Sequence, residues 1–387
     1  MVAPQGFEPR LDESESSVLP LNEGATGVWG RVEVAAAFVS VTGGVGSVKR
    51  TRSVGARRME GMATSAMAAA ASGGWTRSRS LAMRFAWSVV AYNVLVILWG
   101  ALVRATGSGA GCGNHWPLCN GQVIPLAPRV DTMIEFTHRC MTGGATFAVI
   151  GLLMWVFRST VKGQAARRAA VVSGLLLVNE AFLGALLVKL GYVTGNQSLG
   201  RVVMLSVHLA NTLLLLAALT LTATLLGTGQ RWCSLRAEMR GLGWVIAGLG
   251  ATLLVGVSGS LAALGDTLYP SVSLRAAIAA DFSRTAPMLL RVRWVHPASA
   301  VIASAFVLWL LGAAWSRGEH GLAKLVVALL AMQFVLGAAD VLLLAPVWLQ
   351  LLHLLGADLY WVALVAGSAM LVWPARPGFD AIERGVE

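Results

Sequence analysis

Charged residues are scarce in this chain of 387 residues, of which they make up 13%. Hydrophobic residues make up 56% of the same sequence. A chain with so few polar side chains cannot cover an apolar core with a water-soluble surface. The composition therefore argues against a soluble globular protein and places this one in a lipid bilayer.

Acidic residues are the scarcer kind, since 19 Asp and Glu stand against 30 Lys and Arg, a net charge of +11. Such an excess also occurs in nucleic-acid-binding proteins, but here basic residues gather in alternate loops, as the topology signals of membrane proteins do. They are Arg77, Arg79 and Arg84; Arg158, Lys162, Arg167 and Arg168; and Arg231, Arg236 and Arg240. We expect these loops and both termini to face the cytoplasm, and no nucleic-acid partner.

Long apolar runs, by contrast, are abundant. A bilayer-spanning helix needs about 20 mostly apolar residues, and eight segments meet this requirement. They are 85–103, 133–157, 169–190, 202–226, 242–264, 292–315, 322–344 and 347–373. Because only loops connect them, the predicted fold class is an all-α polytopic membrane protein with eight transmembrane helices.

Residues 1–80 have a different composition, rich in Gly, Ser, Ala, Val and Arg, with no span and no heptad pattern. We expect a disordered N-terminal extension. No secretory signal is evident. Met62, Met67 and Met83 are alternative starts, so the segment is either a functional extension or the product of a misassigned start codon. The last residues, 374–387, are expected to form a cytoplasmic tail.

The spans form two copies of a four-helix unit, 85–226 and 242–373, which predicts two pseudo-repeated four-helix bundles. EFTHR in the second span corresponds to VRWVHP in the sixth, and SVHLANTL in the fourth to LLHLLGADL in the eighth. The third and seventh spans align Glu180 with Gln333, residues suited to hydrogen bonds between helices. The repeat thereby pairs His138 with His296, and His208 with His353.

Histidines that repeat in register within membrane spans point to a function, because ionisable groups are costly there. The predicted topology puts all four in the outer leaflet, as two pairs at similar depth. Two imidazoles on neighbouring helices can ligate a haem iron from both sides. Zinc would need further Cys or carboxylate ligands at each site, which only the first half offers. The pattern favours two haem sites, one in each half.

Glu135 precedes His138 by one helical turn, so the two side chains share a helix face. One interpretation is that Glu135 pairs with Arg139 or Arg104 at the membrane interface. The other is that its carboxylate serves a haem site as acid or base. The second half has Arg293 at this position, which suits a haem propionate. The difference predicts one site equipped for chemistry and one that holds its haem permanently.

Two cysteines, Cys112 and Cys119, lie in the outer loop VRATGSGAGCGNHWPLCNGQVIP. The predicted topology places this loop in an oxidising compartment, where a disulfide is chemically reasonable. Such a bridge would either tie down a glycine-rich loop or act as a redox-active dithiol above the first haem site. The sequence leaves both interpretations open.

With GALVRATGSG, CGNHWPLCNG, EFTHR, VHP and the histidines of the fourth and eighth spans in order, the chain resembles the haem A synthase family over about 85–373. This family of membrane enzymes serves cytochrome oxidase assembly. The resemblance implies oxidation of a ring methyl of haem O to a formyl group, through successive hydroxylations and loss of water. It implies that His138 and His208 hold the substrate haem, with Glu135 as the essential acidic group beside it.

The same resemblance implies a resident haem b, held by His296 and His353, that relays electrons. Cys112 and Cys119 match the disulfide-forming pair of the bacterial branch. Haem O would come from haem O synthase, the protohaem farnesyltransferase, in the cell membrane, and the haem sites would lie toward the outer face. The electron donor and the oligomeric state, including a homo-oligomer, stay open.

Two other classes of protein compete with this interpretation. A di-haem b-type electron-transfer cytochrome would explain four histidines, but it requires neither Glu135 nor the cysteine pair, and it would retain two haems of one type. A repeat-built transporter without haem would use the histidines as a proton relay and would be colourless.

Overall fold

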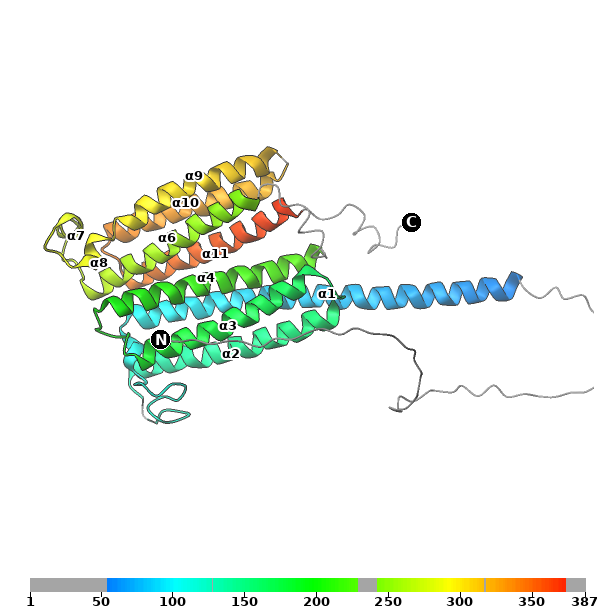
Figure 1. The fold of residues 1–387 in the computed structure, drawn as a ribbon, viewed down its shortest axis with the longest axis horizontal. Coiled ribbons are helices and arrows are strands. Elements are labelled where there is room, and N and C mark those ends of the chain that lie inside the picture. The colour runs from blue at the N-terminus through cyan, green and yellow to red at the C-terminus, as the bar shows by residue number, and fades with distance from the viewer. Residues whose placement is uncertain (1–53, 127, 229–241, 317, 374–387) are drawn as a thin grey trace, which may run out of the picture. The chain divides into compact units, whose positions relative to one another are not determined.

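The computed structural model describes residues 54–126, 128–228, 242–316 and 318–373, and their regular structure is helical (Figure 1). The long helices are α1 (Val54–Ala105), α2 (Val130–Ser159), α3 (Ala165–Lys189), α4 (Leu199–Thr228), α6 (Leu242–Leu268), α9 (Val295–Ser316), α10 (His320–Leu342) and α11 (Val347–Val372). The connection between α1 and α2 contains the short helix η1 (Ser108–Ala110), and that between α6 and α9 contains α7 (Leu274–Phe282) and α8 (Met288–Arg291).

In these described ranges, eight helical segments are long and apolar enough to cross a membrane. This confirms the predicted all-α polytopic membrane fold. Most observed helices extend a few residues beyond the predicted spans, and the first spanning segment is Ser78–Ala105, but α3, α10 and α11 end one or two residues before the predicted ends. The sixth, Met288–Ser316, includes the short α8 before α9.

The expected disorder of residues 1–80 is wrong for residues 54–80, because α1 begins at Val54. This part of the sequence contains many Ala, Met and Arg residues, which favour helix. Once the span has nucleated a helix, each further turn is added without a new nucleation cost. Residues 1–53, the loop 229–241 with its three arginines, and the tail 374–387 lie outside the described residues.

The helices form two sets that match the predicted halves, α1–α4 and α6 with α9–α11 (Figure 1). In the first set α3 packs on both α2 and α4. In the second, α9 packs on α6 and α10, and α10 also on α11. The two sets meet where α4 packs on α6 and α11, and Trp361 of α11 donates a hydrogen bond to Leu213 O of α4 at 2.8 Å. The halves therefore join through α4 of the first set and α6 and α11 of the second.

The larger apolar cluster occupies one end of the first half and extends onto α11. On α2 its buried members are Val149, Leu152 and Val156, which follow His138 by more than ten residues. Because an α-helix rises about 1.5 Å per residue, Val149 lies roughly 16 Å along the helix from His138. Ordinary apolar packing thus holds one end of the bundle together, and the histidines lie toward the other end.

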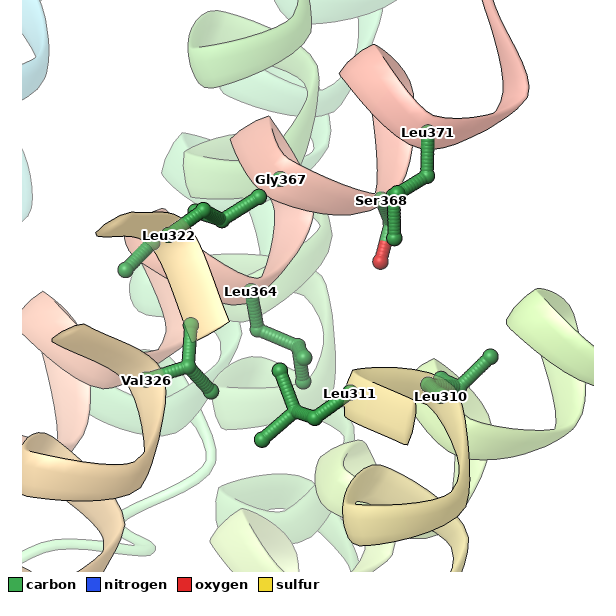
Figure 2. Close-up of a pocket in the computed structure, with 9 residues that line it drawn as sticks. Leu310, Leu311, Leu322, Val326, Leu364, Gly367, Ser368 and Leu371 are labelled. Carbon is green, nitrogen blue, oxygen red and sulfur yellow. The ribbon is translucent and has the colours of Figure 1, made fainter. Parts of the chain in front are cut away.

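A small cavity in the second half, between α9, α10 and α11, is lined mainly by leucine side chains such as Leu310, Leu322 and Leu364 (Figure 2). Its volume is about 10 Å³, which holds one water molecule at most. Apart from the Ser368 hydroxyl, the side chains drawn around it are apolar. This cavity is therefore a packing gap rather than a ligand site.

Candidate functional site

The second-half histidines face each other across the bundle. The ring centroids of His296 on α9 and His353 on α11 are 6.2 Å apart, and the ring planes are nearly perpendicular, at 85°. An imidazole nitrogen binds a metal at about 2 Å, so two rings that ligate one ion from opposite sides have centroids about 6 Å apart. A haem iron takes two such axial ligands from the protein. The geometry of this pair fits a haem.

Polar neighbours hold both of these rings. His296 Nδ1 lies 3.1 Å from the carbonyl oxygen of Val255, to which an Nδ1–H donates. The side-chain amide of Gln333 lies within 3.3 Å of His353 Nδ1. The carbonyl acceptor at His296 Nδ1 fixes the tautomer and orientation of that imidazole and leaves its Nε2 for a metal.

The first-half histidines, His138 on α2 and His208 on α4, are surrounded differently. Nδ1 of each ring is buried and has no hydrogen-bond partner among the described residues. Glu180 Oε1 lies 3.5 Å from His208 Nδ1. Buried polar atoms are normally paired, but neither Nδ1 makes a hydrogen bond that would hold its ring in one orientation. These rings are therefore held less firmly than those of the second half.

Glu180 ties α3 to α4 beside His208. Its Oε2 accepts a hydrogen bond from Asn211 Nδ2 at 2.6 Å, and its Oε1 accepts one from the Thr212 hydroxyl. Asn179 adds a hydrogen bond to Asn211 Oδ1 at 2.8 Å. These are the bonds between helices that the sequence predicts for this position.

Glu135 is buried, with 4% of its surface exposed. Its Oε1 accepts hydrogen bonds from Arg139 Nη2 and Nε at 2.5 and 3.1 Å, and its Oε2 accepts one from the backbone N–H of Cys112 at 2.8 Å. The predicted pairing with Arg139 is present. Arg104 instead donates to two groups of the second half, Ala263 O at 2.7 Å and Gln350 Oε1 at 3.0 Å. Glu135 is thus a carboxylate with three donors directed at it.

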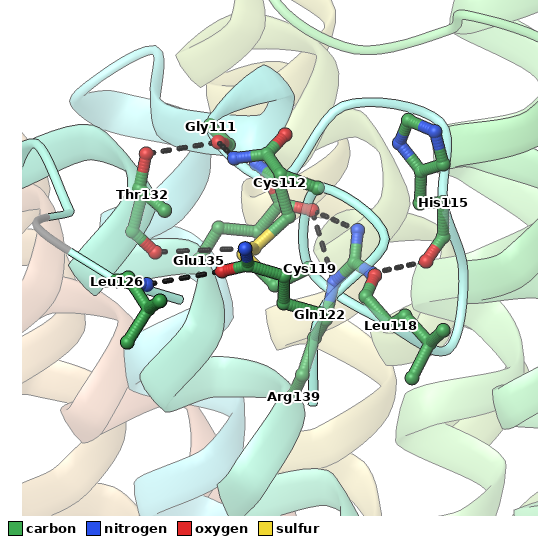
Figure 3. Close-up of a disulfide and its surroundings, with 11 residues drawn as sticks. Gly111, Cys112, His115, Leu118, Cys119, Gln122, Leu126, Thr132, Glu135 and Arg139 are labelled. Carbon is green, nitrogen blue, oxygen red and sulfur yellow. Dashed lines mark hydrogen bonds and ion pairs between the residues drawn. A yellow bond between two sulfur atoms is a disulfide. The ribbon is translucent and has the colours of Figure 1, made fainter. Parts of the chain in front are cut away.

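A disulfide joins Cys112 to Cys119, as the resemblance implied, and both residues are almost fully buried (Figure 3). Arg139 donates to the carbonyl oxygen of Leu118 at 2.5 Å. The Thr132 hydroxyl of α2 donates to Gly111 O at 2.9 Å. The disulfide loop, Arg139 and Glu135 therefore form one hydrogen-bonded unit at the N-terminal end of α2. Sequence reasoning missed this unit, because backbone donors and acceptors leave no signature in a sequence.

Arg293 does not match the expectation that it binds a haem propionate. Its guanidinium donates to Asp266 at 2.6 Å and to Asp281 at 2.8 Å, and it also reaches the carbonyl oxygen of Ala277. The side chain is only 11% exposed. Two carboxylates from α6 and α7 already satisfy this cation, so it holds α7 against the bundle. The only sequence signal was that Asp266 and Asp281 are acidic residues near the ends of apolar segments.

In the part of the chain that the structure covers, no group of three or more His, Cys, Asp or Glu is arranged to hold a metal ion. The candidate metal ligands are thus the two histidine pairs. Haem suits pairs of ligands, because the porphyrin supplies the remaining four positions around the iron.

Comparisons with known proteins point the same way. The family model COX15-CtaA, described as a cytochrome oxidase assembly protein, matches residues 83–365. A Thermus thermophilus protein named "Protoheme IX farnesyltransferase" is 42% identical over 315 residues, which cover 78% of this chain and 51% of that protein.

Two shorter matches are to proteins named "Heme A synthase". The Shouchella clausii protein is 46% identical over 92 residues, 24% of this chain and 31% of that protein. The Alkalihalophilus pseudofirmus protein is 36% identical over 132 residues, 34% of this chain and 42% of that protein. The matched part of this chain thus spans about half the length of the Thermus protein and less of the other two.

The family model covers all eight spans except the ends of the first and the last, and it includes both histidine pairs and the disulfide loop. The matches to the two heme A synthases are partial, but they agree with it. This multi-pass membrane protein therefore belongs to the COX15-CtaA family of cytochrome oxidase assembly proteins.

Proposed function

We propose that this protein is a haem A synthase, which oxidises a ring methyl of haem O to a formyl group. The observation that carries the proposal is the difference between two histidine pairs in repeated halves. One pair has ring centroids 6.2 Å apart and a polar neighbour at each Nδ1. The other has Nδ1 atoms without a hydrogen bond, and a buried carboxylate, Glu135, precedes His138 by one helical turn. Family membership and the similarity to two heme A synthases support it.

The second half is the cofactor site in this proposal. His296 and His353 would hold a haem b, which supplies reversible one-electron chemistry when bound. Val255 and Gln333 keep the two rings oriented, and this suits a group that stays in the protein through many turnovers. The electron donor to this site is outside the chain.

The first half is the substrate site. His138 and His208 would bind haem O, and the lack of partners at their Nδ1 atoms leaves the rings freer to let a substrate enter and leave. An iron with two histidine ligands has no open position for oxygen, so freedom to move away also suits turnover. A farnesylated haem is very apolar and would reach a site between these helices from the lipid.

Glu135 would act as a base beside the substrate. Three donors are directed at its carboxylate and fix its position. Because it lies one helical turn before His138 on α2, it can accept a proton that the oxidation of the methyl group releases. Arg139 and the Cys112 N–H hold the carboxylate in place while it does so.

The topology and partner complete the proposal. The basic loops support an orientation with both termini in the cytoplasm and both histidine pairs toward the outer face. A haem O synthase would supply the substrate. In Thermus thermophilus, a protein named for farnesyl transfer contains, over about half of its length, a sequence like that of this chain. That arrangement supports a partnership between the two activities.

The test is extraction and chromatography of haems from membranes that express this chain together with a haem O synthase. Haem A is expected, and it should be absent when His138→Ala replaces the wild type. Accumulation of only haem b and haem O in folded, haem-loaded protein would instead favour an electron-transfer cytochrome.

A further inference from the structure

Each of the four histidines faces a glycine on the preceding long helix of its half. The distances from an ideal Cβ built on that glycine to Cε1 of the ring are 3.0 Å for Gly100 and His138, 3.7 Å for Gly184 and His208, 2.8 Å for Gly259 and His296, and 3.4 Å for Gly337 and His353. Two of these contacts are tight and two are ordinary. The tight ones fall at equivalent places in the repeat, between α1 and α2 and between α6 and α9.

The tight contacts leave no room for a methyl group. Carbon atoms pack at about 3.5–4.0 Å, so a Cβ at Gly259 would overlap the His296 ring. That Cβ would also lie 3.1 Å from His296 Nδ1. Val255, whose carbonyl oxygen lies 3.1 Å from the same nitrogen, is one helical turn before Gly259 and thus on the same face of α6. The His296 imidazole is thus held by the Val255 carbonyl group and packs directly against the backbone of Gly259.

We propose that Gly100 and Gly259 are positioning residues for haem ligation. By lacking a Cβ, each lets the Cε1 edge of the imidazole on the next long helix approach its backbone closely, and this contact sets the orientation of the ring toward the iron. Gly184 and Gly337 leave more space, so they restrict the ring orientations of His208 and His353 less. The inference rests on the proposed ligation of haem by His296 and His138, but not on the proposed reaction.

The same close approach in both halves argues against an accident of packing. The outer loops of the two halves differ in length. They are also held to the bundle by opposite charges, Glu135 in the first half and Arg293 in the second. The contact between glycine and histidine is nevertheless kept within 0.2 Å, at 3.0 and 2.8 Å. A feature shared by two otherwise different sites reflects what the sites have in common, which is the histidine ligand.

The test uses Gly259→Ala in the full-length protein, purified with the haem b that it retains. The readouts are haem b bound per protein and the low-spin ferric signal in electron paramagnetic resonance, which reports ring orientation. Disturbing the surroundings of a metal ligand typically lowers metal affinity roughly 10-fold or more. We expect a loss of haem b of that order, or a shifted low-spin signal in the haem that remains. Gly337→Ala should give a smaller change.

Gly248→Ala is the matched control, because it adds a methyl group to the same helix at the same distance, 2.8 Å, from Leu310 Cδ1 instead of a histidine. It should leave the haem signal unchanged. An unchanged signal and haem content in Gly259→Ala would overturn the inference, as would an equal change in Gly248→Ala. If the wild type binds no haem b, the proposed cofactor site fails, which is a separate result.

The first half gives a second test that does not depend on the folding of Gly259→Ala. Gly100→Ala should weaken the binding of added haem O and leave haem b in place. Its control is Gly144→Ala on α2, where the new Cβ meets the Tyr92 hydroxyl oxygen at 2.6 Å. Normal haem O binding by Gly100→Ala, or an equal loss in Gly144→Ala, would contradict the role of Gly100.

Discussion

Replacing Glu135 by glutamine separates its charge from its shape. The carboxylate accepts from Arg139 on one oxygen and from the Cys112 N–H on the other. An amide has only one acceptor oxygen, so in either orientation its NH₂ group would face one of these donors. Leaving a buried donor unsatisfied costs about 1–3 kcal/mol. Glu135→Ala is harsher, because losing one partner of a buried ion pair costs about 3–5 kcal/mol.

Glu135→Gln should therefore loosen the disulfide loop and stop haem A formation, while haem b stays bound to the second half. The assay is the rate of haem A formation in membranes with a haem O synthase, together with haem b per protein. Thr132→Val is the control, because it removes a loop hydrogen bond to Gly111 without touching the carboxylate. Haem A made at the normal rate by Glu135→Gln would remove the carboxylate from the mechanism. An equal loss in Thr132→Val would reduce Glu135 to a loop anchor.

Three further outcomes are expected. Replacing Cys112 and Cys119 by serine removes a disulfide worth about 2–3 kcal/mol for a loop of this size, so haem A formation should slow while haem b is retained; unchanged rates would assign the bridge no role in the reaction. His296→Ala or His353→Ala should abolish haem b in the purified protein, measured as a haemochrome, and retention of haem b would contradict the assigned ligands. Arg293→Ala leaves two half-buried carboxylates without their cation and should lower the melting temperature, by an amount equivalent to about 1.5–3 kcal/mol; an unchanged melting temperature would show that this ion pair is not structural.

Glu135 and Arg293 occupy the same place in the repeat, and each holds the connection between the first two long helices of its half against the bundle. Glu135 accepts from the backbone of the disulfide loop, whereas Arg293 donates to the carbonyl oxygen of Ala277 and to Asp281 on α7. The carboxylate thus meets a hydrogen-bond donor in one connection, and the guanidinium meets acceptors in the other. For this reason the charge difference alone does not assign chemistry to the first half, and the mutants are needed.

The sequence by itself determined the membrane fold, the eight spans and the registered histidines. These depend on local composition and on spacing along one helix, which a sequence displays directly. Its prediction failed at residues 54–80, where helix propensity and extension from an existing span outweighed a composition that suggests disorder.

Only the tertiary structure decided what surrounds each histidine. It brought a glycine of one helix against the ring of the next, placed the Cys112 N–H on Glu135, and gave Arg293 two aspartates. These contacts use backbone atoms or residues far apart in the chain. Every residue carries the same backbone groups, so no residue type marks the ones that will be used. Which groups meet is fixed when the helices pack.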